Sequence, residues 1–228
     1  MRILAFASRK GGSGKTTLAG HLAVQAQLCG AGPVAVVDID PQGSLAEWWN
    51  ERDSDLPVYA QTTVSRLSQD LQELRSQGIK LVVIDTPPAI TMAIYSVISV
   101  SELIVIPTRP SPHDLRAVGA TVELCARSSK PLIFAVNGAT VGASITREAI
   151  IALSEHGTVA PMVVHNRTDF AVSMIHGRTV MEVNPGGRSA AEVARLWDYI
   201  QERLERGFRR TVFSSARPSG EFGRRETA

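Results

Sequence analysis

The sequence predicts an α/β fold in which a mostly parallel, twisted sheet is covered by helices on both faces. Short runs of apolar, mainly β-branched residues recur along the chain, and each is separated from the next by a segment long enough for a helix. The runs occupy residues 3–7, 34–39, 80–85, 103–107, 132–137 and 159–164. Buried strands that alternate with helical segments indicate a parallel sheet enclosed on both sides. The length of 228 residues suits one such domain.

The segments between the runs predict helices at residues 16–28, 63–76, 114–127, 144–156 and 189–205. The apolar stretch over 89–107 contains Glu102 and is bounded by prolines, so we interpret it as a helix followed by a strand and not as a membrane span. In the last helix, helical spacing predicts one buried stripe, made of Val193, Leu196, Trp197, Ile200 and Leu204.

The charge of the chain is concentrated at its C-terminal end. The formal net charge is only +2, but residues 203–228 hold seven Arg against three Glu. The periodicity fades after Gly207, so we divide the chain into a domain over 1–206 and an Arg/Ser/Gly-rich tail over 207–228 that we expect to be disordered. The two cysteines, Cys29 and Cys125, have no metal-site or disulfide spacing, and we expect a cytoplasmic protein.

The strongest motif is KGGSGKTT at residues 10–17, between the first predicted strand and the first helix. Glycines let the backbone bend around phosphate groups, so that N–H groups and the helix N-terminus point at the anion. Lys15 fits the residue that meets the β- and γ-phosphates, and Thr16 fits the hydroxyl that holds Mg²⁺. A strict GxxxxGK[ST] pattern fails because Arg9 replaces its first glycine, and a second lysine, Lys10, follows instead.

With this loop the chain resembles the deviant Walker A ATPases of the ParA/MinD family, whose signature is KGGxGKT[ST]. The resemblance runs from residue 2 to about residue 205. VVDIDPQGS at residues 36–44 is similar to the family's DxDPQG switch, and VVIDTPP at residues 82–88 is similar to its Walker B strand. The resemblance implies the three-layer P-loop NTPase fold, with ATP and Mg²⁺ as cofactors, and is greatest to the small stand-alone members that partition or position cargo.

The resemblance also implies the residues of the site. ATP binding is expected at Lys10, Gly11, Gly12, Ser13, Gly14, Lys15, Thr16, Thr17 and Asn137. The Mg²⁺ site is expected at Thr16, Asp40 and Asp85, with the carboxylates binding directly or through water. The catalytic residues are expected to be Lys10, Lys15 and Asp40. Asp40 is expected to position the attacking water, and Lys10 to reach the partner's nucleotide in an ATP-sandwiched homodimer.

Three of these positions leave alternatives open. Asp85 closes an apolar strand, where a lone carboxylate is costly unless it meets a cation, but a strand-end turn would also suit it. Asn137 ends a strand, where open α/β sheets bind ligands, and the resemblance implies adenine contact, although it could be a turn residue before a glycine. Asp38 is expected to support the Mg²⁺ shell or its own loop.

The resemblance further implies partners. We expect an ATP-dependent switch that binds double-stranded DNA nonspecifically, associates with the nucleoid, and partitions DNA or positions a protein cargo with a ParB-like or cargo-adaptor protein that stimulates weak hydrolysis. The candidate DNA contacts are Arg167, Arg178, Arg195 and Arg203. A MinD-like membrane switch and a nucleotide-gated scaffold without significant turnover are the rivals. We do not expect a membrane partner, because LERGFRRTVF near the C-terminus is short for an amphipathic anchor.

Overall fold

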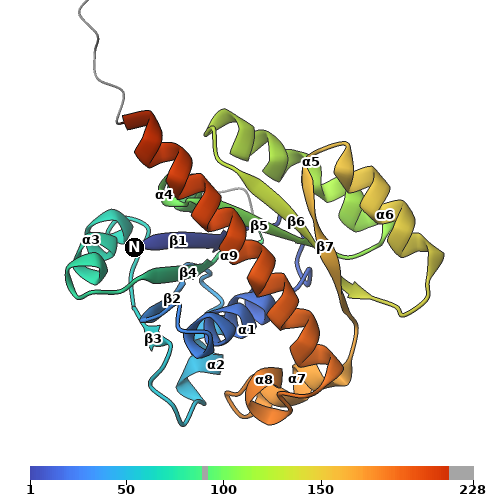
Figure 1. Ribbon diagram of the computed structural model, residues 1–228, viewed down its shortest axis with the longest axis horizontal. Coiled ribbons are helices and arrows are strands. Elements are labelled where there is room, and N and C mark those ends of the chain that lie inside the picture. Colours follow the sequence, from blue (N-terminus) through green and yellow to red (C-terminus); the bar gives the residue numbers. More distant parts are fainter. Residues whose placement is uncertain (89–91, 216–228) are drawn as a thin grey trace, which may run out of the picture.

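The computed structural model describes residues 1–88 and 92–215, with side chains through residue 206, and has one seven-stranded sheet (Figure 1). Its order is β3-β2-β4-β1-β5-β6-β7, and every neighbouring pair is parallel. The strands are β1 (Arg2–Phe6), β2 (Val34–Asp38), β3 (Val58–Tyr59), β4 (Leu81–Asp85), β5 (Leu103–Thr108), β6 (Leu132–Ala139) and β7 (Thr158–His165). The predicted α/β class and P-loop NTPase fold are confirmed.

The helices fill the segments between the strands. They are α1 (Lys15–Leu28), α2 (Ser44–Asn50), α3 (Leu67–Ser76), α4 (Met92–Val100), α5 (Pro112–Arg127), α6 (Ser144–Ser154), α7 (Thr168–Ile175), α8 (Val180–Val183) and α9 (Arg188–Ser215). The expected helices are all present, and their ends move by a few residues except at the C-terminal end of α9. The sequence analysis missed β3, α2, α7 and α8, which are too short to show a clear periodicity.

The last helix is longer than expected. We placed the end of the domain at residue 206, but α9 continues through Gly207 to Ser215. A single interior glycine costs a helix only about 1 kcal/mol, and no proline occurs before Pro218, so nothing in this stretch forces the helix to stop. The expected disorder of residues 216–228 lies outside the described residues and stays a prediction.

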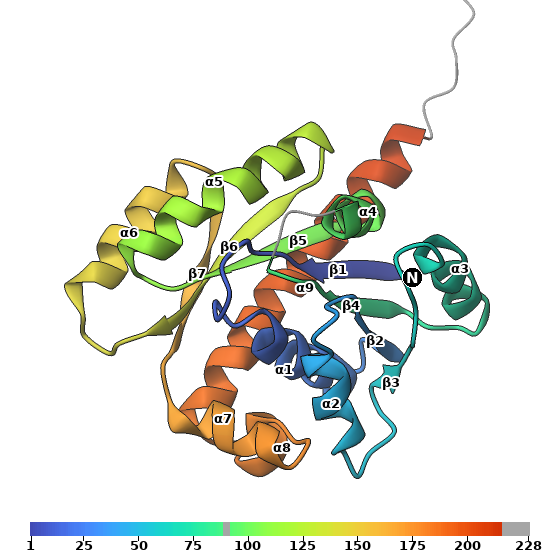
Figure 2. The same ribbon diagram turned by 180° about the vertical axis from the view of Figure 1, so that it is seen from behind.

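Alternate strand residues face opposite sides of the sheet, and each side has its own helices. Leu4 and Phe6 of β1 point toward α1 and α9, in a cluster that also includes residues of α2 and α8. Ile3 and Ala5 point the other way, toward α3 and α4. The β5–β6 half of that second face packs on α5 and α6. Figures 1 and 2 show these layers from front and back, with α9 crossing the sheet beside α1.

The predicted stripe on α9 is confirmed. All five of its apolar residues are buried, and Trp197 is among the largest fully buried side chains of the described chain. The helix also meets the first strand directly, because the Arg2 guanidinium donates a hydrogen bond to the Leu204 carbonyl. The two ends of the domain are therefore joined across one face.

The order of the strands places the loop after β1 at a switch point of the sheet. From β1 the chain first builds the β4, β2 and β3 side, and then passes to β5 on the other side of β1. Open α/β sheets bind ligands in the crevice at the carboxyl ends of the strands where the winding reverses. The loop over 7–14 opens at this edge.

One buried histidine links α1 to the helices beside it. His21 is fully buried, with its Nδ1 donating to the Thr17 carbonyl over 2.8 Å and its ring lying 5.1 Å from that of Phe170 on α7. Its Nε2 has no hydrogen-bond partner among the described residues. Burial lowers the pKa of His21 to about 4, so this histidine is neutral at physiological pH.

Neutral His21 makes the free energy of unfolding depend on pH. The unfolded chain binds a proton there near pH 6.5 and the folded chain only near pH 4, so acidification favours unfolding. Between pH 7 and pH 5 this one group should remove about 2 kcal/mol of stability. His21→Asn keeps a donor for the Thr17 carbonyl and should lose about 2 kcal/mol less over that interval in urea unfolding. An equal loss in both proteins would contradict the assignment.

Candidate active site

The loop between β1 and α1 owes its shape to glycines. Gly12 and Gly14 have φ of +72° and +97°, in the left-handed region that side chains rarely adopt. A Cβ on Gly14 would lie only 2.0 Å from the Asn137 Nδ2 atom. Gly14 is therefore required twice, by its backbone angle and by the close approach of β6.

Asn137 holds this loop in place. Its side chain is buried, and its Nδ2 donates a hydrogen bond of 2.8 Å to the Ser13 carbonyl. The sequence analysis found the position of Asn137 at the end of a strand, but not this contact, which joins residues far apart in the chain. The expected contact with adenine stays a prediction.

Two buried polar groups, one in the loop and one at the start of α1, have no partner among the described residues. The Ser13 hydroxyl has no hydrogen-bond partner, and no hydrogen bond or ion pair of the described residues uses the Lys15 ammonium, although Lys15 is only 7% exposed. Burial lowers the pKa of Lys15, and the charges of Asp85 and Asp40 oppose that shift. Buried polar groups normally have partners, so these two fit a bound phosphate.

Thr16 and Asp85 meet beside the lysine. The Thr16 Oγ1 donates a hydrogen bond of 2.5 Å to an Asp85 carboxylate oxygen, and the other oxygen accepts one from the Thr86 N–H. Asp85 is 1% exposed, and burial raises its pKa to about 7. A hydroxyl and a buried carboxylate without a cationic side chain in contact are the oxygen ligands that suit Mg²⁺, which keeps most of its other ligands as water and substrate phosphate.

No group of three or more His, Cys, Asp or Glu side chains able to hold a metal occurs within residues 1–88 and 92–215. The described residues therefore do not form a site in which such side chains supply three or more metal ligands. Mg²⁺ in nucleotide sites is usually held by one or two protein ligands together with phosphates, so the pair of Thr16 and Asp85 fits that mode.

Asp38 organises the switch loop. One of its carboxylate oxygens accepts from the Asp40 N–H, and the other accepts from the N–H groups of Leu45 and Ala46 in the first turn of α2. Burial raises the pKa of Asp38 despite these bonds. Of the two roles left open, the structure shows support of the loop. The motif drew attention to Asp38, but α2 itself was not predicted, so its capping went unseen.

Asp40 lies at the turn of the same loop. It is half-buried, and its Oδ1 accepts from the Gln42 N–H over 3.0 Å. Its charge is felt at Lys15, which places it on the same edge of the sheet. Lys10 is exposed at the start of the glycine loop, with only its backbone N–H in a described bond, to Ser8. The catalytic roles of both residues stay predictions.

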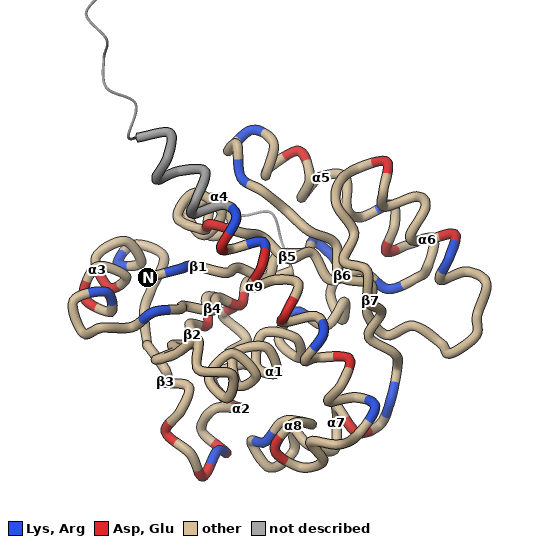
Figure 3. The backbone as a smooth tube through the Cα atoms, in the orientation of Figure 1, with Lys and Arg blue, Asp and Glu red and all other residues tan. Residues whose placement is uncertain are grey.

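The four candidate DNA-binding arginines differ in their surroundings. Arg167 is ion-paired with buried Glu192 over 2.6 Å, and Arg203 packs on Tyr199 while it donates to Thr158. Arg178 is exposed between α7 and α8, and Arg195 is exposed on α9. Figure 3 shows that basic and acidic residues are interspersed along the described part of α9.

Comparison with known proteins assigns the chain to a family. The profile of the CobQ/CobB/MinD/ParA nucleotide binding domain matches residues 4–180. The chain belongs to this family. The match covers the glycine loop, the switch loop with Asp38 and Asp40, and the Walker B strand that ends at Asp85. Members of the ParA/MinD family are ATPases.

Two relatives of the ParA/MinD type are named "Maintenance of carboxysome distribution protein A". The protein of Gloeobacter kilaueensis is 33% identical over 222 residues, which cover 92% of this chain and 96% of the relative. The protein of Halothiobacillus neapolitanus is 32% identical over 200 residues, which cover 83% and 91%. The chromosome-partitioning ATPase Soj of Thermus thermophilus is 25% identical over 251 residues, covering 90% and 97%.

Solved structures show the same fold. An ATP complex of a Cyanothece McdA variant superposes with a TM-score of 0.73 at 17% identity, over 90% of this chain and 96% of that one. The septum site-determining protein MinD of Pyrococcus horikoshii, complexed with Mg-ADP, also gives a TM-score of 0.73, at 15% identity and over 90% and 98% of the chains.

Among the described helices, none combines the length and the apolar character that a membrane span requires.

The closure of the loop on Asn137 predicts unequal effects of two glycine substitutions. Gly14→Ala imposes an unfavourable φ and displaces the Asn137 amide, so it should lower the free energy of unfolding by about 2–4 kcal/mol. Gly11→Ala is the matched control, because its Cβ would meet nothing within 4 Å and its φ is not positive. Its effect should stay within about 0.5 kcal/mol. Urea unfolding measures both, and similar losses would show that the loop is not held as described.

Proposed function

We propose that the chain is a ParA-like ATPase that acts as an ATP-dependent dimerisation switch, binds DNA nonspecifically, and positions DNA or a protein cargo in a bacterial cell. The observation that carries the proposal is the cluster of Lys15, Thr16 and Asp85 beneath a ParA-type glycine loop. The two relatives named for carboxysome distribution favour a protein cargo over a plasmid.

In this proposal, the residues of the loop bind and neutralise the triphosphate of ATP. Lys15 contributes a buried positive charge, and the Ser13 hydroxyl and the loop N–H groups donate hydrogen bonds. Mg²⁺, when bound, neutralises charge on the phosphates, and Thr16 and Asp85 are the residues that would hold it. Asp40 orients the attacking water. Phosphoryl transfer depends mainly on such positioning and charge neutralisation.

The proposed switch loop connects hydrolysis to α2. Asp38 binds both the Asp40 backbone and the first turn of α2, so a movement of Asp40 toward or away from the phosphate is transmitted to that helix. Lys10, exposed at the mouth of the loop, is the residue that we expect to cross to the partner's nucleotide. Both features support a dimer that forms with ATP and separates after hydrolysis.

Among the candidate DNA contacts, Arg195 and Arg178 are the stronger. Both are exposed without an ion pair in the described structure, whereas Arg167 pairs with Glu192 and Arg203 donates a hydrogen bond to Thr158. Affinity that rests on phosphate contacts increases with the number of those contacts. A dimer presents twice the positive charge of one subunit to DNA, so it should bind more tightly. DNA retention would then follow the nucleotide state.

The catalytic assignment predicts separable effects of two substitutions. Asp40→Ala should lower the ATP turnover rate at least tenfold (about 1.4 kcal/mol or more in barrier) and still allow ATP-dependent DNA retention. Lys15→Ala should lose both, because the phosphates lose their buried cation. Lys80→Ala is the control and should match the parent, because Lys80 is an exposed lysine immediately before β4. Phosphate release and retention of random-sequence DNA at low salt measure the two activities.

Two results would reject this function. Turnover by Asp40→Ala at the parent rate would remove Asp40 from catalysis. Failure of the ATP-bound parent to retain random-sequence DNA at low salt would remove the DNA partner, and would leave a nucleotide switch with another output.

The exposed position of Arg195 on α9 predicts a specific salt dependence. Arg195→Ala should weaken DNA binding and reduce the slope of log K against log salt by about 1 for each phosphate that the side chain neutralises. Arg127→Ala is the control, since Arg127 is exposed on α5 on the opposite face and pairs with Glu123. Fluorescence anisotropy with a random duplex at several salt concentrations gives the slopes. Equal slopes for parent and Arg195→Ala would assign DNA binding to other residues.

A further inference from the structure

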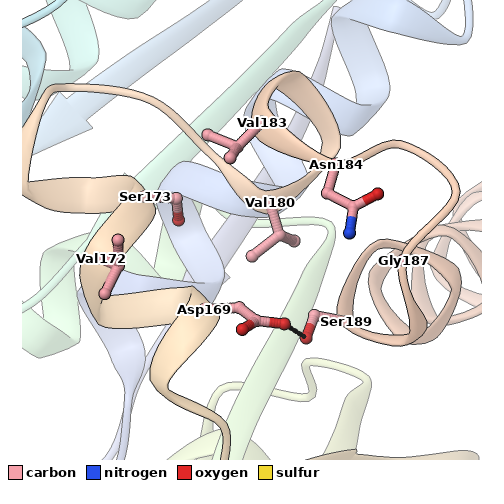
Figure 4. Close-up of a pocket in the computed structure, with 8 residues that line it drawn as sticks. All are labelled: Asp169, Val172, Ser173, Val180, Val183, Asn184, Gly187 and Ser189. Carbon is pink, nitrogen blue, oxygen red and sulfur yellow. Dashed lines mark hydrogen bonds between the residues drawn. The ribbon is translucent and has the colours of Figure 1, made fainter.

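A cavity of about 210 Å³ lies where α7, α8 and the first turn of α9 meet (Figure 4). None of its lining residues belongs to the proposed ATP site. They are Asp169, Val172, Ser173, Val180, Val183, Asn184, Gly187 and Ser189. Small-molecule sites usually enclose about 300–1,000 Å³, so this cavity is closer to the size of a single anchoring side chain.

One side of the cavity is apolar and partly open to solvent. Val172 and Val183 are 56% and 47% exposed, and Val180, which also lines the cavity, is buried. Ile175 at the end of α7 is 65% exposed and extends the apolar surface beyond the cavity. Figure 4 shows Val180 facing Asp169 across the space. Valines on two helices around an opening form a surface that hydrocarbon can cover.

The other side is polar and negatively charged. Asp169 is exposed; one of its carboxylate oxygens accepts a hydrogen bond of 2.8 Å from the Ser189 hydroxyl, and it has no cation within 4 Å in the described structure. The Asn184 amide is also exposed and makes no hydrogen bond to the described residues. Nearby arginines do not neutralise Asp169, because Arg52 pairs with Glu182 and Arg167 with Glu192.

We propose that this cavity receives an arginine side chain from a peptide segment of a partner protein. The arginine stem packs along the valines, and the guanidinium donates to the Asp169 carboxylate and to the side-chain carbonyl oxygen of Asn184. Arginine suits the site better than lysine, because its planar group donates in two directions at once. The match between an apolar wall, an unpaired carboxylate and a carboxamide selects this occupant.

In this proposal the arginine belongs to another molecule. This inference goes beyond the proposed switch and does not depend on it.

The first test compares two probes on the full chain. Nα-acetyl-arginine amide should shift the backbone amide resonances of α7 and α8 saturably, at millimolar concentration. Nα-acetyl-citrulline amide has nearly the same shape but no charge, and should bind at least about fivefold more weakly. Equal binding of both probes, or shifts confined to other elements, would overturn the proposal.

The second test changes the carboxylate. Asp169→Asn keeps an acceptor for the Ser189 hydroxyl but removes the charge, so it should weaken binding of the arginine probe at least about fivefold. Asp198→Asn, an exposed residue on α9 that does not line the cavity, is the control and should bind as the parent does. Unchanged binding by Asp169→Asn would overturn the proposal, provided that its circular dichroism matches the parent.

Two further readouts separate the outcomes. ATP turnover of Asp169→Asn should equal that of the parent, so loss of the arginine site and failure of the proposed ATPase function are measured independently. Shifts of the α7 and α8 amides that grow with protein concentration without any probe, and vanish on truncation after Ser215, would assign the cavity to a second copy of this chain. That result would overturn the proposed partner.

Discussion

The burial of one carboxylate at the end of β4 constrains the rest of the site. Asp85 has almost no contact with water, and its oxygens are held by the Thr16 hydroxyl and the Thr86 N–H. Thr86 in turn donates through its hydroxyl to the Phe6 carbonyl. These bonds fasten β4 to the first turn of α1 and to the end of β1. A buried carboxylate is tolerated there because hydrogen bonds hold it.

The edge of the sheet extends this arrangement to the switch loop. Asp38 lies opposite Asp85 in the register of β2 and β4, so both strands end in a carboxylate at the same level. The two carboxylates have different hydrogen-bond partners. Asp85 faces the helix that follows the glycine loop, whereas Asp38 caps α2 and holds the Asp40 backbone. Neighbouring strands thus place two carboxylates with different hydrogen-bond partners at the same level of the sheet.

The sequence predicted those parts of the fold and site that depend on local pattern. Continuous apolar runs gave the six main strands, and the spacing of lysine, glycine and threonine after the first gave the loop that carries Lys15. Contacts between distant residues were not predictable. The bond from Asn137 to the Ser13 carbonyl joins β6 to the glycine loop, 124 positions earlier in the chain. The pattern of charges in the sequence also could not show that Arg167 forms an ion pair with Glu192 while Arg195 stays exposed.

The contact of Arg2 with the Leu204 carbonyl also bears on the order in which the protein forms at the ribosome. The α1 face of the sheet is closed by residues of α9, including Trp197 and Ile200, that are among the last of the domain to be synthesised. Until they emerge, the apolar side of α1 and of β1 remains uncovered. Long-range contacts of this kind slow folding and leave apolar surface exposed to other chains. The nascent chain therefore carries its nucleotide loop complete long before it can bury the helix behind that loop.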